Sequence, residues 1–177
     1  MSDYSKEISE SIRRILEELN LEYSFFPNEG KYKMMFINND DTIKRLQYII
    51  KIYESDYNLY IVFPIGVKPD DREKMIKILE FISRANHHLL DGDFEINMKN
   101  GVIRYKVYVD CASGVPDDEV IKNSIYCPAA MCKIYGSGIA DIIFNNKDPL
   151  DALEECERED QDSIHTEEIK NTDNKAV

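Results

Sequence analysis

Histidine and cysteine are scarce in this sequence, which has three histidines and four cysteines among 177 residues. The cysteines form no CxxC pair and lie at no zinc-finger spacing, so we expect reduced, mostly structural thiols. A cysteine hydrolase is also disfavoured, because Cys127 or Cys132 would need an imidazole nearby. The histidines of the sequence are His87, His88 and His165.

Long apolar runs and excess positive charge are missing as well. No stretch approaches the roughly 20 uninterrupted apolar residues of a membrane-spanning helix, and the N-terminal residues lack the basic and apolar pattern of a signal peptide. We therefore expect a cytoplasmic location. The 34 acids against 22 bases give a formal net charge of −12, which repels phosphate backbones and anionic headgroups. Nucleic acid and membranes are not expected as partners.

One hydrophobic core is expected, because 43% of the residues are hydrophobic and one domain is usual at this length. We assign this domain to residues 1–160. The acidic excess lies toward the end, where residues 151–177 carry ten acids and three bases. Residues 161–177 have little to bury, so we expect a disordered acidic tail that cannot offset its own ordering entropy. A docking arm for a basic partner is the alternative.

Hydrophobic periodicity and turn residues predict the secondary structure. Residues 5–20 repeat apolar side chains at helical spacing, whereas 21–54 is rich in aromatic and β-branched residues. Asn100-Gly101 predicts a two-residue hairpin turn, and Pro128 is expected to kink or split its helix. The full prediction is helix 5–20, strands 21–26, 32–38, 44–54 and 58–67, helix 68–90, hairpin 93–110, helix 115–144 and a short helix from Asp148.

This order of elements predicts an α+β fold. Its antiparallel sheet should have about five strands, with helices packed on one face.

The run FISRANHHLLDGDFEINMKNGVIRYKVYVDC, residues 81–111, resembles the YbjN family, whose fold is that of the type III secretion chaperones. The resemblance lies in a helix that ends in Asn, a following leucine, a Gly-Asp-Phe strand start and a hairpin of alternating aliphatic residues. The segments IVFPIGVKPDDREKM and DPLDALEEC also look like that family, so the resemblance spans most of residues 1–157. It contains no catalytic signature. It implies a compact, usually dimeric, non-enzymatic domain similar to chaperones that hold a partner's extended segment along sheet edges and hydrophobic grooves.

The stretch FISRANHHLLDGDFEIN, residues 81–97, has the composition of a small metal site, but its spacing argues against one. Adjacent helical residues point about 100° apart, so His87 and His88 cannot ligate one ion from the same helix face. The following acids do not complete a calcium loop, because Ile96 and Val102 occupy the positions that need glycine and glutamate. We therefore expect no metal, no cofactor and no catalytic residue here.

A structural joint between a helix and a strand accounts for the same stretch. Asn86 lies on the apolar helix face, so its amide should hydrogen-bond backbone groups nearby. Gly92 should supply a permissive backbone angle, after which Phe94, Ile96 and Met98 alternate inward. The joint residues are Asn86, Gly92, Asn100 and Gly101.

The resulting functional hypothesis is a non-enzymatic protein-binding module, chaperone-like or regulatory, that acts as a homodimer on an unknown protein client. Dimerisation is expected from the resemblance and from apolar helix positions such as Ile76 and Phe81. These positions lie outside the predicted core stripe, which consists of Met75, Leu79, Ile82 and Leu89. The alternative is a small ligand-binding domain or enzyme with a pocket between sheet and helices.

Overall fold

The computed structural model describes residues 4–37 and 43–160. Within these ranges the chain forms four helices and one six-stranded sheet. The expected acidic tail, 161–177, lies outside the described residues. The elements are α1 (Lys6–Glu18), β1 (Tyr23–Phe26), β2 (Lys31–Ile37), β3 (Arg45–Ile52), β4 (Asp56–Gly66), α2 (Arg72–Asn86), β5 (Asp93–Ile96), β6 (Val102–Asp110), α3 (Asp118–Asn145) and a helix over 149–160.

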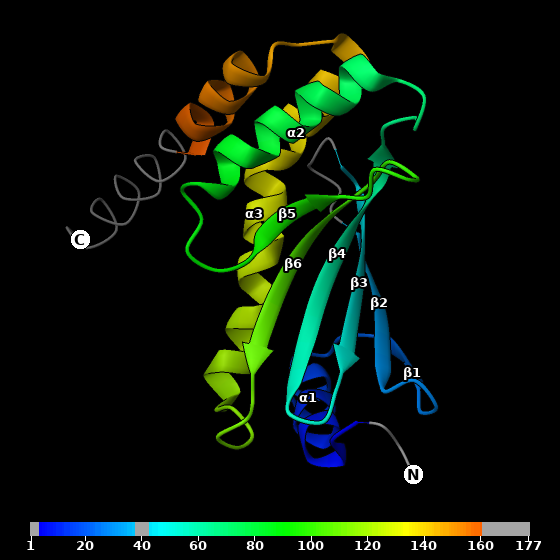
Figure 1. Cartoon of the computed structure of the whole chain (residues 1–177). Helices are drawn as coiled ribbons and strands as arrows, with labels where there is room; N and C mark the ends of the chain where they lie inside the picture. Colours follow the sequence, from blue (N-terminus) through cyan, green and yellow to red (C-terminus); the bar gives the residue numbers. More distant parts are fainter. Residues whose placement is uncertain (1–3, 38–42, 161–177) are drawn as a thin grey trace, which may run out of the picture.

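All strand pairs in the sheet are antiparallel, and the strand order is β1-β2-β3-β4-β6-β5. Figure 1 shows α1 and α3 on the same side of this sheet, while α2 packs against α3 and β5. The α+β fold with helices on one face is therefore confirmed. The sheet has six strands rather than about five, because the four predicted strands and both strands of the predicted hairpin all join it, with Tyr23–Phe26 and Asp93–Ile96 at its two edges.

Local sequence signals set the helix boundaries. The Ser5 side chain accepts a hydrogen bond from the Ile8 amide at the start of α1, and Asp71 accepts one from Lys74 at the start of α2. The helix over 149–160 begins after Asp148, whose carboxylate accepts from the Leu150 amide at 2.9 Å. Serine and aspartate are favoured at these cap positions because their oxygens satisfy helix amides that have no partner within the helix.

Helix α3 is continuous over 28 residues and contains Pro128. Of the two effects expected at Pro128, a split of the helix is wrong, because α3 runs unbroken from Asp118 to Asn145. Proline removes one backbone donor, but Pro128 and the residues around it on the same face, Ser124, Ile125 and Cys132, are buried against the sheet. Tertiary packing of this face offsets the lost hydrogen bond.

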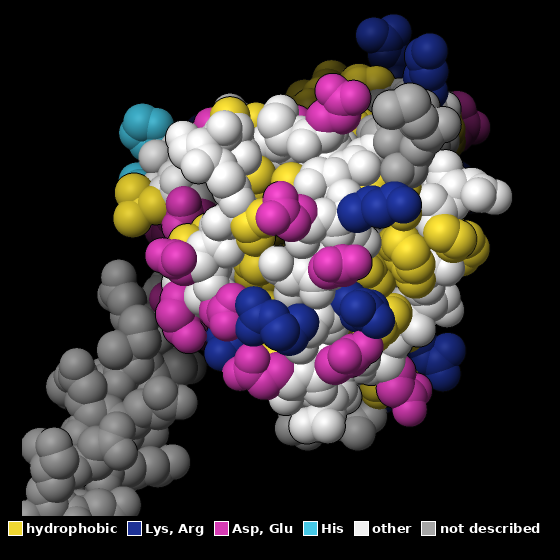
Figure 2. All heavy atoms as spheres, turned by 90° about the horizontal axis from the view of Figure 1, so that it is seen from below, with side chains coloured by type: hydrophobic (Ala, Val, Ile, Leu, Met, Phe, Trp, Pro, Cys, Tyr) yellow, Lys and Arg dark blue, Asp and Glu magenta, His cyan; other side chains and the backbone are white. Residues whose placement is uncertain are grey.

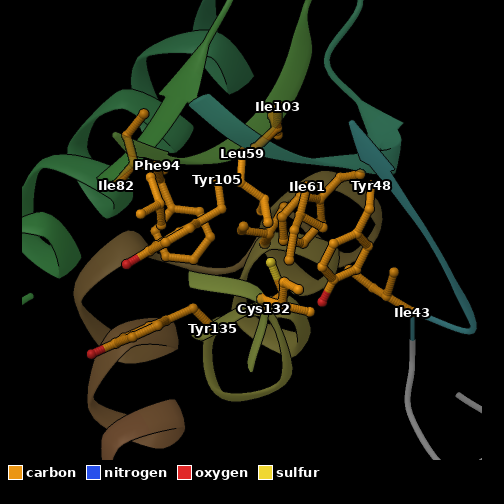
Figure 3. Close-up of a cluster of buried hydrophobic side chains, with 14 of the residues drawn as sticks. Ile43, Tyr48, Leu59, Ile61, Ile82, Phe94, Ile103, Tyr105, Cys132 and Tyr135 are labelled. Carbon is orange, nitrogen blue, oxygen red and sulfur yellow. The ribbon is translucent and has the colours of Figure 1, made fainter. Parts of the chain in front are cut away.

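The core lies between the covered face of the sheet and the helices. Figure 3 shows side chains from β3, β4, β5, β6, α2 and α3 packed together, including Tyr48, Leu59, Phe94, Tyr105 and Cys132. Alternate residues along each strand contribute to this layer, as the two-residue period of a strand requires.

Two buried hydroxyl pairs connect helices to the sheet. Tyr32 of β2 lies 2.9 Å from the Ser9 hydroxyl of α1 and donates to the Ser9 carbonyl at 3.0 Å. Tyr57 of β4 lies 2.9 Å from the Ser124 hydroxyl of α3. These pairs satisfy polar groups that burial would otherwise leave unpaired, so they fix each helix at one position on the sheet.

Helix α2 buries a wider face than its sequence pattern predicts. Met75 and Ile82 are buried as expected, but Phe81 is also fully buried, with its ring 6.3 Å from that of Tyr135. The expectation that Phe81 needs a second copy to cover it is wrong, because α2 contacts α3 and β5 from two directions. Ile76 is 62% exposed and is the large apolar side chain of α2 that stays exposed to solvent.

Candidate functional site

The Asn86 amide joins the end of α2 to the edge strand β5. Its nitrogen donates to the Phe94 carbonyl at 3.0 Å, and its oxygen accepts from the Phe94 amide at 2.8 Å. A side-chain amide has one donor side and one acceptor side, so it can satisfy both backbone groups that an edge strand directs away from its neighbour. Asn86 therefore takes the place of a further strand beside Phe94.

Gly92 lies between α2 and β5 with a φ of +81°. A Cβ atom at this position would lie 2.5 Å from the Lys106 carbonyl oxygen and 2.7 Å from the Tyr105 ring. Both the backbone angle and the close approach of β6 favour glycine here. The Tyr105 hydroxyl donates to the carbonyl of the neighbouring Asp91, which fixes the loop against β6.

The connection between β5 and β6 is longer than the sequence suggests. It covers residues 97–101, and the Asn97 carbonyl accepts from the amides of Asn100 at 3.2 Å and Gly101 at 2.7 Å. The predicted two-residue turn is wrong, because Gly101 has a φ of +70° whereas Asn100 does not adopt a positive φ. The lengthened turn leaves Met98 54% exposed rather than directed inward.

His87 and His88 follow the last residue of α2 and are exposed. Of the acids after them, Glu95 accepts a hydrogen bond from Arg104 of β6 at 2.6 Å, and burial raises the pKa of Asp93. Within the described ranges, no three His, Cys, Asp or Glu side chains group as a metal site would require.

The thiols show no sign of activation. Cys111, Cys132 and Cys156 are buried, and burial raises the pKa of each, to about 11 for Cys111. A thiol with a raised pKa carries little thiolate near neutral pH, so it is a poor nucleophile. Cys127 is exposed.

One open hollow lies at the end of β4, away from the packed layer between sheet and helices. It is formed by residues 63–69 and 100–102. The titratable side chain among these residues is Lys68, for which no carboxylate or imidazole partner lies in the same lining. The hollow does not form the pocket between sheet and helices that a small enzyme would need.

Within the described residues, no helix covers the other face of the sheet (Figure 1). The β1–β3 half of this open face carries a cluster of basic side chains. The register places Lys31 of β2 opposite Lys51 of β3, and Lys33 is the next residue on the same face of β2. We call Lys31, Lys33 and Lys51 the basic corner. Directly opposed like charges are unfavourable in a sheet, so this arrangement needs a compensating group.

Glu29, in the turn between β1 and β2, supplies that compensation. Its carboxylate pairs with Lys31, and the Lys51 ammonium donates to its backbone carbonyl. The hydrogen bond from Lys31 lowers the pKa of Glu29, and the charges of Lys51 and Lys33 lower it further. The Glu29 carboxylate is therefore hydrogen-bonded to Lys31 and interacts with Lys33 and Lys51 through their charges.

Aromatic and apolar side chains surround the basic corner. Lys31 and Lys33 lie over the Phe26 ring, 5.1 and 5.3 Å from its centroid, in the geometry of cation–π contacts. At the other end of β2, Met35 is 55% exposed and Ile37 is 64% exposed. Along β2 the open face thus changes from basic to apolar, and Arg45 of β3 lies opposite Ile37 at the apolar end.

This surface could not be predicted from the sequence alone. The alternation of Lys31, Tyr32, Lys33 and Met34 predicts that both lysines share one face of a strand. It does not show that Lys51 lies opposite Lys31, because that pairing depends on the register of β2 and β3.

Comparison with known proteins identifies the fold. No family model and no curated protein matches the chain. The structure of YbjN from E. coli, a proposed transcription regulator, aligns with a TM-score of 0.51 at 10% identity, covering 71% of this chain and 86% of that chain. The fold is similar to that of YbjN. The resemblance found in residues 81–111 is therefore confirmed at the level of fold.

A type III chaperone–effector structure, the HopA1–SchA complex, also aligns with the chain. The TM-score is 0.45 at 9% identity, and the alignment covers 68% of this chain and 86% of that chain.

None of the helices in the described ranges combines the length and hydropathy needed to cross a bilayer.

Proposed function

We propose that this YbjN-like domain is a non-enzymatic protein-binding module, chaperone-like or regulatory, that acts as a homodimer on a protein client. The observation that carries the proposal is the uncovered face of the sheet. Its β1–β3 half exposes Met35 and Ile37 beside the basic corner, a combination of apolar and charged groups typical of protein-binding surfaces.

The chemistry of the remaining candidate residues supports binding rather than catalysis. General acid–base or nucleophilic catalysis needs a nucleophile and a base within hydrogen-bond reach of each other. The buried thiols have raised pKa values, and the exposed His87 and His88 follow α2 without joining a group of metal-ligating side chains in the described ranges.

The proposed dimer is supported by exposed apolar side chains at the opposite end of the molecule from α1. Ile76 of α2, Phe144 of α3 and Leu150 are 62%, 68% and 41% exposed. Their elements meet at this end (Figure 1), where Lys77 of α2 donates to the Asn146 side chain at 2.8 Å. A second copy covering these side chains would remove apolar area from water.

Sedimentation equilibrium tests the dimer, and cross-linking mass spectrometry in the native cell tests the client. We expect a dimer at micromolar concentration that Ile76→Asp weakens by roughly tenfold or more, since exposed apolar anchors dominate such interfaces. Val120→Asp, which changes an exposed side chain at the start of α3, is the matched control. A monomeric parent with no cross-linked protein partner would contradict the proposed function.

A further inference from the structure

The charge on the β1–β3 half of the open face is opposite to that of the chain. The strand positions on this half-face include Lys31, Lys33, Arg45 and Lys51 and no acid, although the formal net charge of the chain is −12. Glu29 is bonded to the basic corner from the adjoining turn, so one carboxylate offsets part of this charge.

Several basic side chains elsewhere in the described residues have acidic partners. Arg104 and Lys106 both pair with Glu95 on the β5–β6 half of the same sheet face. At the α1 end, Arg14 pairs with Asp118, and Lys122 pairs with Glu18. Figure 2 shows acidic and basic side chains intermixed on this end. On the β1–β3 half-face the ion pair formed within the described residues is that of Lys31 with Glu29, so the strand positions keep an excess of positive charge.

The shape of this half-face suits an extended chain. From Lys31 to Ile37 the strand β2 spans about 20 Å, at about 3.3 Å per residue. Along this line the side chains on the open face change from the half-buried lysines of the basic corner to the exposed Met35 and Ile37. An extended segment of similar length could place acids over the lysines and apolar side chains over Met35 and Ile37.

We propose that the open face of β1–β3 binds a short, extended polypeptide segment of a partner protein, with acidic residues against the basic corner and apolar residues against Met35 and Ile37. This inference rests on the proposed function and specifies the chemistry of the client segment that the domain would bind. Charge complementarity of this kind selects partners and accelerates their association more than it adds affinity.

Single-stranded nucleic acid fits the half-face less well. Binding of that kind combines a basic groove with aromatic rings on which bases stack. Here the Phe26 ring already carries the ammonium groups of Lys31 and Lys33, and the Tyr60 ring carries the Arg104 guanidinium 4.3 Å from its centroid. The net charge of −12 also repels a long polyanion more than a segment with a few acids.

The probe is a fluorescein-labelled peptide of about ten residues, long enough to span β2, with alternating acids in one half and alternating leucine and valine in the other. Fluorescence anisotropy measures its affinity for the full chain at low and high salt. Comparison peptides carry glutamine or lysine in place of the acids. A single-stranded oligonucleotide of the same net charge is measured in parallel.

The variant Lys33→Glu/Lys51→Glu reverses the charge of the basic corner. The matched control Lys68→Glu/Lys133→Glu makes the same charge change at exposed positions outside the sheet. We expect the basic-corner variant to bind the acidic peptide roughly tenfold or more weakly, and the control to bind it within about twofold of the parent. Higher salt should weaken binding by the parent.

Amide chemical shifts of the parent locate the peptide without any substitution, so the test stands even if the double variant does not fold. Shifts gathered in β1–β3 support the inference. The inference would be overturned if the lysine peptide bound as tightly as the acidic peptide, or if the oligonucleotide bound more tightly. It would also be overturned by chemical-shift changes confined to another surface, or by no peptide binding at all. A dimer whose client cross-links elsewhere would overturn this inference while leaving the proposed function standing. A monomer that binds the acidic peptide at β1–β3 would leave this inference standing and overturn the homodimer of the proposed function.

Discussion

Replacing Asn86 by leucine tests whether one amide fixes the junction of α2 and β5. Leucine has a similar size but cannot make the two hydrogen bonds to Phe94, at 3.0 and 2.8 Å. Each net hydrogen bond contributes about 1 kcal/mol, and a buried group left without a partner costs about 1–3 kcal/mol. Since these bonds are partly buried, we expect Asn86→Leu to lower the free energy of unfolding by about 2–3 kcal/mol.

Chemical denaturation followed by circular dichroism measures this loss. Asn145→Leu is the matched control, because Asn145 is exposed and bonds to the Asp141 side chain on the same helix. It should change stability by less than about 0.5 kcal/mol, as surface substitutions usually do. The double change His87→Gln/His88→Gln should have a similarly small effect with or without zinc. Equal stability of Asn86→Leu and the parent would refute the reasoning about the amide. Zinc-dependent stability that the histidine change abolishes would show a metal site at the joint.

Three further substitutions test other parts of the account. Gly92→Val should cost about 2 kcal/mol or more, since valine must adopt a φ of +81° with its Cβ 2.5 Å from the Lys106 carbonyl; a melting temperature equal to the parent's would contradict this. Tyr48→Phe should raise stability by up to about 1 kcal/mol in denaturant titrations, because the buried Tyr48 hydroxyl has no hydrogen-bond partner among the described residues. A loss of stability would show that this hydroxyl has a partner. For Tyr57, burial raises the pKa from 10.0 to about 12, so the unfolded state loses this proton first. The protonated Tyr57 side chain stabilises the fold fully below pH 10. The free energy of unfolding then falls by about 2–3 kcal/mol as pH rises toward 12. Tyr57→Phe should therefore show a shallower alkaline loss of stability, and an unchanged slope would contradict the assignment.

Features with a strong local cause could be predicted from the sequence. The predicted strand 44–54 closely matches β3 at Arg45–Ile52, because β-branched and aromatic residues favour a pleated surface. The predicted short helix from Asp148 is also found, and its local signals are Asp148 as the cap residue and Pro149 in the first turn. In both cases, residues close in the sequence determine the structure.

Features that depend on long-range packing could not be predicted in the same way. Phe81 seemed available for a partner because the sequence does not show that α3 places Tyr135 beside it. The turn after β5 is five residues long because Gly101 alone, and not Asn100, adopts a positive φ. The basic corner depends on the pairing of Lys31 with Lys51, which only the sheet register reveals.

Lysine-specific cross-linking mass spectrometry in the native cell tests the central claim most directly, because every residue of the basic corner is a lysine. The account predicts that cross-links to a protein partner concentrate at Lys31, Lys33 and Lys51, and that the linked partner segment contains acids beside apolar residues. Cross-links that favour Lys68 and Lys133, on other surfaces of the molecule, over the basic corner would contradict it.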